Sequence, residues 1–497
     1  MDDALTASVS DLLRTAAAQA ASPERLAEIN ELSERLVGPL RVAIAGKVKA
    51  GKSTLLNALI GEELAPTDAG ECTRIITWYS HGHQPQIVLH PKTGAPEAAY
   101  FTRAGALEVE LGNRTPADIH RLEVSWPIDR LAGLTLIDTP GIDSISTDLS
   151  ARTLRALTPE DDRPPLVDAV IYLLRHTHKS DIRFLESFHD DDLAHGTPMN
   201  AVGVLSRADE IGSCSLDALD TAERIATRYQ SEPRLRRLCP VIVPVAGLLG
   251  NTAVSLRQPE YRALVTLARG PMDDCDHLLL TVDRFATHPS TIAVTELERE
   301  HLLDRFGLFG VRWCIEQIRL GRVQSATELA AALQTRSGLT QLRKVLLRQF
   351  TERSRILKAH SALAGLQSIL RTGGCVNPDG LRARIEQITA NAHAFEEVRL
   401  LNELRTNGLE LTEDRAIELD FLLGGSGHDP ASRLRLPESP DDGEIRSASV
   451  KLLQGWQLLA EHPLTSRTVE VAARGAIRTL EGIMSRAATE ESGPVSA

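Results

Sequence analysis

The distribution of apolar and polar positions divides the chain into two parts with different periodicity. Between residues 41 and 255, short apolar runs rich in β-branched residues alternate with turns and helical stretches. The runs predicted as strands are 42–45, 75–79, 86–89, 134–137, 170–174, 202–205 and 241–245. Strands that alternate with helices are typical of a wound α/β sheet. We therefore predict an α/β domain, with a mostly parallel sheet and flanking helices, over residues 41–255.

The rest of the chain has helical periodicity. Ser22 and Pro23 are the residue types of a helix N-cap and first turn, and apolar residues at 26, 29, 32 and 36 follow on one face. From residue 256 the helical pattern continues almost to the C-terminus. We expect the N-terminal helices, residues 1–40, to join an elongated all-α bundle formed by residues 256–497.

Two features subdivide this helical part. Apolar residues at helical spacing over 339–370 predict a helix about 50 Å long if it is straight. With a second run that stops at Asn407-Gly408, they predict a long helical hairpin over about 339–407. The stretch from about 424 to 443 is rich in Gly, Pro, Ser and Asp, a composition typical of a linker or mobile loop. Two last helices are expected after it, around Gln454 and Arg474.

Length, charge and cysteine usage narrow the class of protein. A chain of 497 residues is expected to form more than one packed domain. Lys and Arg number 55 against 67 Asp and Glu, a formal charge of −12, whereas general nucleic-acid binders are more often basic. The six cysteines include no CxxC pair, and no secretory apolar region or bilayer-length apolar stretch is present. We expect a cytoplasmic protein with reduced thiols, no signal peptide, no transmembrane span and no nucleic-acid partner.

The strongest motif lies between the first predicted strand and the helix expected over 54–60. It is GxxxxGK[ST], formed by Gly46, Lys47, Val48, Lys49, Ala50, Gly51, Lys52 and Ser53. A strand before this motif and a helix after it are the context that it requires. Its backbone N–H groups surround phosphate oxygens, Lys52 contacts the outer phosphates, and the Ser53 hydroxyl ligates Mg²⁺. We predict that these residues, with Thr54, bind a nucleotide.

A second element follows the apolar strand 134–137. Asp138 begins the sequence DTPG, where a carboxylate can reach Mg²⁺ through water and the N–H of Gly141 can contact a γ-phosphate. Its position about 85 residues after the P-loop, at the carboxyl end of a strand, is that of the second Mg²⁺ element of a P-loop NTPase. Between the two motifs, Thr73 is either a switch threonine that adds oxygen ligands to the metal or an ordinary loop residue.

Two later segments are candidates for recognition of the nucleotide base. Ser206, Arg207 and Asp209 follow the strand 202–205 in the sequence SRAD, at the place of the guanine-reading [NT]KxD motif. Asp209 can accept both N1–H and N2–H of guanine, a contact that adenine cannot make. Arg207 replaces the usual lysine, and its stem can still cover the base. After the last strand, the small residues at 245–247 (Val245, Ala246 and Gly247) are where a backbone N–H is expected to reach guanine O6.

The order of these elements is that of a GTPase domain. With KAGKSTLLNALIGEELAPTDAGECTRI, DTPG, SRADEIG and a large helical remainder, nearly the whole chain resembles the bacterial dynamin-like GTPases, most closely the actinobacterial isoniazid-induced proteins of the IniC and IniA type. The resemblance implies a GTPase head on a helical neck and trunk, Mg²⁺ as cofactor, and hydrolysis of GTP to GDP and phosphate. It also implies head dimerisation coupled to stalk movement, as a homodimer or with a related dynamin-like GTPase. Finally, the resemblance implies that the protein acts in envelope stress and makes peripheral contact with anionic membrane at the inner face of the plasma membrane.

The resemblance carries family roles onto matching positions. It assigns Lys52 and Ser53 to phosphate and Mg²⁺, Thr73 to switch I, Asp138 with Gly141 to switch II, and Asp209 to guanine. Lys49 stands where eukaryotic dynamins have a small polar residue that helps to hold a monovalent cation. Its ammonium either offsets charge between the β- and γ-phosphates or points to solvent. Lys47 has the spacing of the signature lysine of MinD-like ATPases, but SRAD argues against that family.

Several alternatives stay open at this level. No Gln or Asp directly follows DTPG to position the attacking water, so hydrolysis by an isolated head is expected to be slow. A GTP-gated scaffold with little turnover is therefore a second hypothesis, and an ATP-driven partition protein is a third. The basic helical region 304–371 either pairs within the molecule or touches anionic lipid. Within it, 305–313 is either an amphipathic membrane contact or a packing contact, and the scattered histidines give no zinc site.

Overall fold

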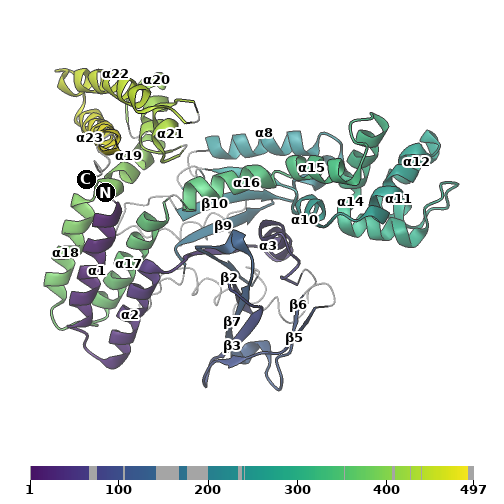
Figure 1. Ribbon diagram of the computed structural model, residues 1–497, viewed down its shortest axis with the longest axis horizontal. Helices are drawn as coiled ribbons and strands as arrows, with labels where there is room; N and C mark the ends of the chain where they lie inside the picture. Colours follow the sequence, from purple (N-terminus) through teal and green to yellow (C-terminus); the bar gives the residue numbers. More distant parts are fainter. Residues whose placement is uncertain are drawn as a thin grey trace, which may run out of the picture.

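A nine-stranded, mostly parallel sheet forms the centre of the computed structural model, and helices cover it and extend from it (Figure 1). The structure describes residues 2–66, 75–103, 107–140, 167–175, 200–232, 235, 238–239, 241–351, 353–405, 409–425, 427–437 and 439–490. The α/β class and the helical C-terminal region predicted from the sequence are confirmed.

The sheet has the strand order β11-β10-β9-β1-β8-β2-β7-β3-β4, and β5 and β6 form a separate pair. The strands are β1 (Leu40–Gly46), β2 (Ile76–His81), β3 (Gln86–Pro91), β4 (Glu97–Ala98), β5 (Phe101–Arg103), β6 (Leu107–Val109), β7 (Ile119–Trp126), β8 (Leu134–Asp138), β9 (Ala169–Leu174), β10 (Ala201–Ser206) and β11 (Ile242–Val245). From β11 to β8 all neighbours are parallel, and antiparallel pairs begin at β2. All seven predicted strands are present.

The helices up to residue 336 are α1 (Asp2–Ala17), α2 (Pro23–Val37), α3 (Lys52–Ile60), α7 (Ile211–Cys214), α8 (Ala218–Ser231), α10 (Gly247–Ser255), α11 (Gln258–Arg269), α12 (Met272–Leu278), α13 (Val282–Thr287), α14 (Glu296–Arg319) and α15 (Ala326–Arg336). They are followed by α16 (Leu339–Leu346), the π-helical segment η6 (Leu347–Thr351), α17 (Ser354–Arg371), α18 (Pro378–Asn391), α19 (His393–Arg405), α20 (Glu413–Leu422), α21 (Pro430–Leu434), α22 (Asp442–Glu461) and α23 (Arg467–Glu490). Short 3₁₀ turns lie at Pro116–Asp118 (η2), Asp129–Leu131 (η3) and Ala208–Glu210 (η5).

The helical part packs as three units. One hydrophobic cluster joins sheet residues such as Tyr172 to helix residues as far along the chain as Leu333, so α10–α15 share the core of the head. We expected the head to end at residue 255; the packed core continues beyond it, because apolar side chains of these helices belong to the same cluster as side chains of the sheet. A second cluster unites α1, α2, α17 and α18, and a third holds α19–α23. Figure 1 shows α11–α14 and the α1/α2/α17/α18 bundle at opposite ends of the sheet.

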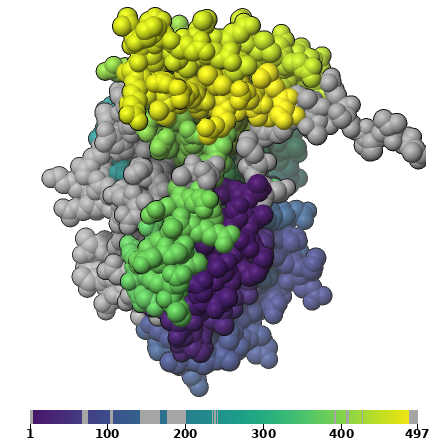
Figure 2. Space-filling view, turned by 90° about the vertical axis from the view of Figure 1, so that its left-hand side faces the viewer, coloured from purple at the N-terminus to yellow at the C-terminus, as the bar shows by residue number. Residues whose placement is uncertain are grey.

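The N-terminal helices join this second bundle, which we call the neck. Figure 2 shows α1 beside the later neck helices, with the C-terminal bundle above them. Ser22 caps α2 by accepting the N–H of Arg25, as its sequence predicts. The neck meets the sheet at a buried ion pair, in which Arg35 Nη2 lies 3.0 Å from Asp168 Oδ1 and also donates to Ser361 Oγ of α17.

The stretch 339–370 does not form the single straight helix expected from its periodicity. It divides into α16, η6 and α17. At the break, Gln349 Nε2 donates to the carbonyl of Gly425, and Arg353 donates to the carbonyl of Gly424. Hydrogen bonds to a distant segment therefore accompany the change in helical register, and local periodicity carries no information about them.

The stretch 424–443 is also not a simple linker. It contains α21, and Arg433 of this helix is buried, with its guanidinium nitrogens 2.6 and 3.0 Å from the two carboxylate oxygens of Glu397 in α19. A buried, doubly hydrogen-bonded ion pair anchors this segment to the C-terminal bundle. The two last helices, α22 and α23, follow it as expected.

The segment 305–313 lies inside α14, and its packing interpretation is confirmed. Phe306 and Phe309 are buried, and Trp313 packs against the same cluster. Arginines of the basic region make intramolecular contacts: Arg305 pairs with Glu63 and Glu260, and Arg319 with Asp276. No helix in the described part of the chain combines the length and the apolar character needed to cross a membrane.

Candidate nucleotide-binding site

The predicted site residues that the structure describes gather at one edge of the sheet. Gly46 ends β1, Asp138 ends β8, Ser206 ends β10 and Val245 ends β11. These strands are parallel, so their carboxyl ends lie at the same edge, where ligands of open α/β sheets bind. Thr73 and Gly141 lie outside the described residues.

The P-loop turns between β1 and α3. Gly46 has a φ of 151°, and a Cβ built on it would come within 2.9 Å of the Leu173 carbonyl oxygen on β9, so only glycine fits there. Gly51, with a φ of 90°, precedes the first turn of α3. The free N–H groups of that turn and the helix dipole favour an anion at this place.

Lys52 begins α3 and lies against the loop. Its Nζ donates to the carbonyl oxygens of Gly46 and Lys47, both at 3.3 Å. Burial lowers the pKa of Lys52, and the charge of Asp138 opposes this shift. A phosphate would replace two long contacts with a partner of opposite charge. Val48 and Lys49 are exposed, and Lys49 has a left-handed backbone with a φ of 60°.

Asp138 and Ser53 meet beside the P-loop. Ser53 Oγ donates to Asp138 Oδ2 at 3.0 Å, while Oδ1 is buried and receives no hydrogen bond from the residues that the structure describes. Burial raises the pKa of Asp138, although Lys52 and the Ser53 hydroxyl counteract it. A hydroxyl next to an unsatisfied buried carboxylate oxygen is the hard-oxygen donor set that Mg²⁺ prefers. These residues therefore fit a magnesium ion.

Thr139 anchors the strand end that carries Asp138. Its Oγ1 donates to the carbonyl of Ile44 on β1 at 2.8 Å, and the side chain is buried. Because β1 leads directly into the P-loop, this bond holds the end of β8 against the start of the phosphate-binding turn. The position of the Asp138 carboxylate is thus tied to that of the loop.

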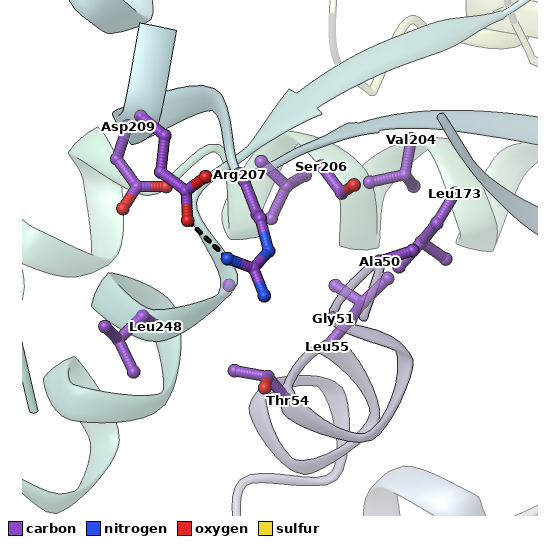
Figure 3. A pocket seen from close by; sticks show the side chains of 13 residues that line it. Ala50, Gly51, Thr54, Leu55, Leu173, Val204, Ser206, Arg207, Asp209 and Leu248 are labelled. Atoms are coloured by element: carbon purple, nitrogen blue, oxygen red, sulfur yellow. Dashed lines mark hydrogen bonds and ion pairs between the residues drawn. The ribbon is translucent and has the colours of Figure 1, made fainter. Parts of the chain in front are cut away.

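A cavity of about 150 Å³ opens next to the P-loop. Its walls come from the P-loop and α3, the ends of β9, β10 and β11, and the start of α10; Figure 3 shows the side chains that line it. Asp209 of η5 lies in this wall with 7% of its surface exposed. Burial raises the pKa of Asp209 to about 6. A ligand that donates hydrogen bonds to this carboxylate would relieve the cost of its burial.

Arg207, which also belongs to the SRAD turn, lines the same cavity. Its backbone is left-handed, with a φ of 51°, and Nη1 donates to Glu210 Oε1 at 2.5 Å (Figure 3). Glu210 also accepts from Arg175 Nη2 at 2.6 Å. The guanidinium lies between Asp209 and Thr54 in Figure 3, so an entering base must displace it or lie beneath its stem.

The loop after β11 differs in one respect from the sequence expectation. Ala246, one of the three residues from which a backbone N–H was expected to reach the base, donates its N–H to the carbonyl of Ser337 at 3.0 Å and is buried. Gly247 begins α10 and, with Val245, lines the cavity. Because the first N–H groups of a helix have no partner within it, Gly247 and Leu248 present the available donors.

Sequence reasoning missed several residues around the cavity, including Leu55, Leu173 and Val204 in its lining. Leu248 and Glu210 also line it. Gly307, in the middle of α14, has a non-helical backbone and lies behind the wall, so that its Cβ position is 3.8 Å from Asp209 Oδ2 and 3.6 Å from Leu248 Cδ2. A glycine inside an amphipathic helix was the one signal for this bend, and it gave no link to Asp209 about 100 residues earlier.

Comparisons with known proteins identify the family of this chain. Residues 42–191 match the model described as the dynamin family. The chain is 40% identical over 459 residues, 92% of each chain, to "Isoniazid-induced protein IniC" of Mycobacterium tuberculosis. It is 27% identical to "Bacterial dynamin-like protein" of Nostoc punctiforme over 40% of this chain and 29% of the relative. A solved structure described as "An oligomerised bacterial dynamin pair provides a mechanism for the long range sensing and tethering of membranes" aligns with a TM-score of 0.30 and 12% identity, covering 98% of this chain and 75% of that one.

Proposed function

Because the chain belongs to the dynamin family, we propose that it is a dynamin-like GTPase that hydrolyses GTP to GDP and phosphate with Mg²⁺ as cofactor. The observation that carries the proposal is the convergence of three groups at one edge of the sheet. The P-loop offers a phosphate site, the Ser53–Asp138 pair offers oxygen ligands beside it, and Asp209 lines the adjoining cavity. Together they match a phosphate chain, its metal and a purine base.

Each residue has a separate task in this proposal. The N–H groups of the P-loop and Lys52 bind the phosphate oxygens, and Ser53, with Asp138 acting through water, holds Mg²⁺. When bound, Mg²⁺ neutralises charge on the β- and γ-phosphate oxygens. Asp209 orients guanine by accepting N1–H and N2–H. Lys49, exposed on the loop, is free to approach the phosphates when a second head covers the site.

Assembly is part of the proposed function. We expect head dimerisation, as a homodimer or with a related dynamin-like GTPase, to accelerate hydrolysis and to move the helical stalk. A cytoplasmic protein that acts peripherally at the inner face of the plasma membrane in envelope stress fits the family. The alternative is a GTP-gated scaffold with little turnover that pairs with a related partner; it rests on the lack of a Gln or Asp directly after DTPG.

The dependence of turnover on concentration tests the proposal. The rate of GTP hydrolysis per head is expected to rise with protein concentration and with anionic liposomes, because assembly completes the site. The measurement is phosphate release over a range of protein concentrations, with ATP as the control nucleotide and Lys52→Ala as the blank. A rate that stays near zero and flat under both conditions, despite tight GTP binding, contradicts the enzyme and supports the scaffold.

Guanine-nucleotide binding is expected to weaken in acid. Asp209 must be ionised to accept two N–H groups, and its pKa in the free protein is raised to about 6. Affinity for GDP is therefore level above that pH and falls below it, to about one tenth at pH 5. The measurement is the dissociation constant of GDP from pH 7.5 to 5.

The terminal phosphate of GDP titrates in the same range, so a control is needed. Asp209→Asn retains the phosphate contribution and lacks the carboxylate, and the difference between the two profiles isolates Asp209. Parallel profiles for the two proteins would contradict this role of Asp209.

A further inference from the structure

The turn between α15 and α16 touches the base-binding loop although it lies some 90 residues further along the chain. Its two residues are Ser337 and Gly338. The carbonyl of Ser337 accepts the N–H of Ala246 at 3.0 Å, and both residues are fully buried. This bond is the reason that Ala246 cannot offer its N–H to a base.

Gly338 brings the two segments into direct contact. Its φ is +75°, and a Cβ built on it would lie 2.2 Å from the carbonyl oxygen of Pro244 and 3.6 Å from the Cα of Val245. Distances below 3 Å to backbone atoms require one segment to move. The turn therefore lies against the last strand of the sheet at the point where β11 passes into the base loop.

Further bonds fix the conformation of the turn. Ser337 Oγ donates to the Gln334 carbonyl at 2.8 Å and accepts the N–H of Leu339 at 3.2 Å. Leu339 is buried, and its Cδ2 lies 3.3 Å from the Cβ position of Gly250 in α10. The turn and the first residue of α16 thus contact the chain on both sides of Gly247, at Ala246 in the loop and at Gly250 in α10.

We propose that the Ser337–Gly338 turn is a positioning element for guanine selection, which holds the start of α10 so that Gly247 presents its N–H to the O6 atom of the base. The inference rests on the proposed function and adds residues that no sequence motif contains. Ser337 and Gly338 touch no nucleotide atom themselves. They act by occupying the N–H of Ala246 and by setting the position of the next residue, which lines the cavity.

This role has a signature that depends on the base. Guanine and hypoxanthine both carry O6, adenine does not, and only guanine adds the N2 amine that Asp209 accepts. Displacement of the N–H group that donates to O6 should therefore weaken the binding of GDP and of IDP by the same factor and leave the binding of ADP unchanged. Damage that reaches Asp209 should weaken GDP more than IDP, and general damage to the P-loop should weaken all three.

The test is Gly338→Ala, compared with Gly321→Ala. Gly321 also has a left-handed backbone, with a φ of +67°, but no atom lies within 4 Å of its Cβ position, so it reproduces the strain without the contact. Dissociation constants of GDP, IDP and ADP are measured by calorimetry for the full-length chain. Gly338→Ala is expected to weaken the binding of GDP and of IDP about tenfold each, which corresponds to the loss of one hydrogen bond. Gly321→Ala is expected to change none of the three dissociation constants.

Other patterns overturn the inference. No change in Gly338→Ala, an equal loss for all three nucleotides, a larger loss for GDP than for IDP, or the same changes in Gly321→Ala would each contradict it. If Gly338→Ala does not fold, Ser337→Ala serves instead, because it removes the side-chain bonds of the turn without added bulk; the same pattern with a smaller loss is expected. A wild-type protein without preference for GDP over ADP would contradict the proposed function itself, whereas a preference that survives in both variants contradicts this inference alone.

Discussion

Asp209→Asn is expected to lower the affinity for GDP by about 10³-fold and to raise the affinity for XDP. Asp209 lies in the wall of the base cavity and is 7% exposed, so the guanine N1–H and N2–H would meet an amide in place of a carboxylate. A site built around hydrogen bonds to its substrate discriminates strongly, because an unmatched buried polar group has no water to replace the lost partner. Xanthine carries a carbonyl at the 2-position, which can accept from the new amide.

Glu210→Gln is the matched control for this substitution. Glu210 lines the same cavity, but its carboxylate pairs with Arg207 and Arg175. Calorimetry with GDP, XDP and ADP should show the exchange of preference in Asp209→Asn and at most small changes in Glu210→Gln. An unchanged nucleotide preference in Asp209→Asn would contradict the assignment of guanine and favour the ATP-driven alternative.

Asp138→Asn is expected to lower GTP turnover by about 10³-fold and to weaken Mg²⁺ binding by about 10- to 100-fold, as is usual when a group that orients metal-bound water is altered. The amide keeps the shape of the side chain and can still accept from Ser53, but it has no charge for the metal. Burial already raises the pKa of Asp138. In the absence of ligands, the variant without this charge should therefore be at least as stable as the wild type.

Lower turnover together with undiminished stability of the ligand-free variant would distinguish a role of Asp138 in metal binding from a role in the fold. Thermal unfolding is measured with and without Mg²⁺ and GDP, and turnover is measured over a range of Mg²⁺ concentrations. Asp129→Asn, an exposed carboxylate in η3, is the control. Loss of stability in ligand-free Asp138→Asn, or turnover equal to that of the control, would show that Asp138 serves the fold rather than the metal.

The strands and the P-loop were predictable because their information is local. A buried central strand such as β9 is apolar along its whole length, and the phosphate loop is encoded within eight consecutive residues. Strand β7 was not predicted because polar and apolar residues alternate along it, with only one face buried. Its apolar residues are separated by polar ones and therefore never form a continuous run.

The helical part shows where local information ends. The periodicity of 339–370 is the same whether the helix is straight or broken, and the break at η6 coincides with bonds from Gln349 and Arg353 to a segment over 70 residues away. The Gly- and Ser-rich composition of 424–443 is typical of a loop, yet Arg433 ties it down through Glu397. The composition of a segment indicates its local conformational preference, but not the tertiary contacts that it makes.

The sequence by itself determined the α/β class, the phosphate loop, the residues proposed for metal and base, and the all-α character of the second part, because each depends on neighbours along the chain. Tertiary structure alone decided that α10–α15 belong to the core of the head, that Gly307 lies behind Asp209, and that Ser337 takes the N–H of Ala246. These relations join residues about 80 or more positions apart. They arise from the packing of buried side chains and the need of buried backbone groups for hydrogen-bond partners, which no local pattern records.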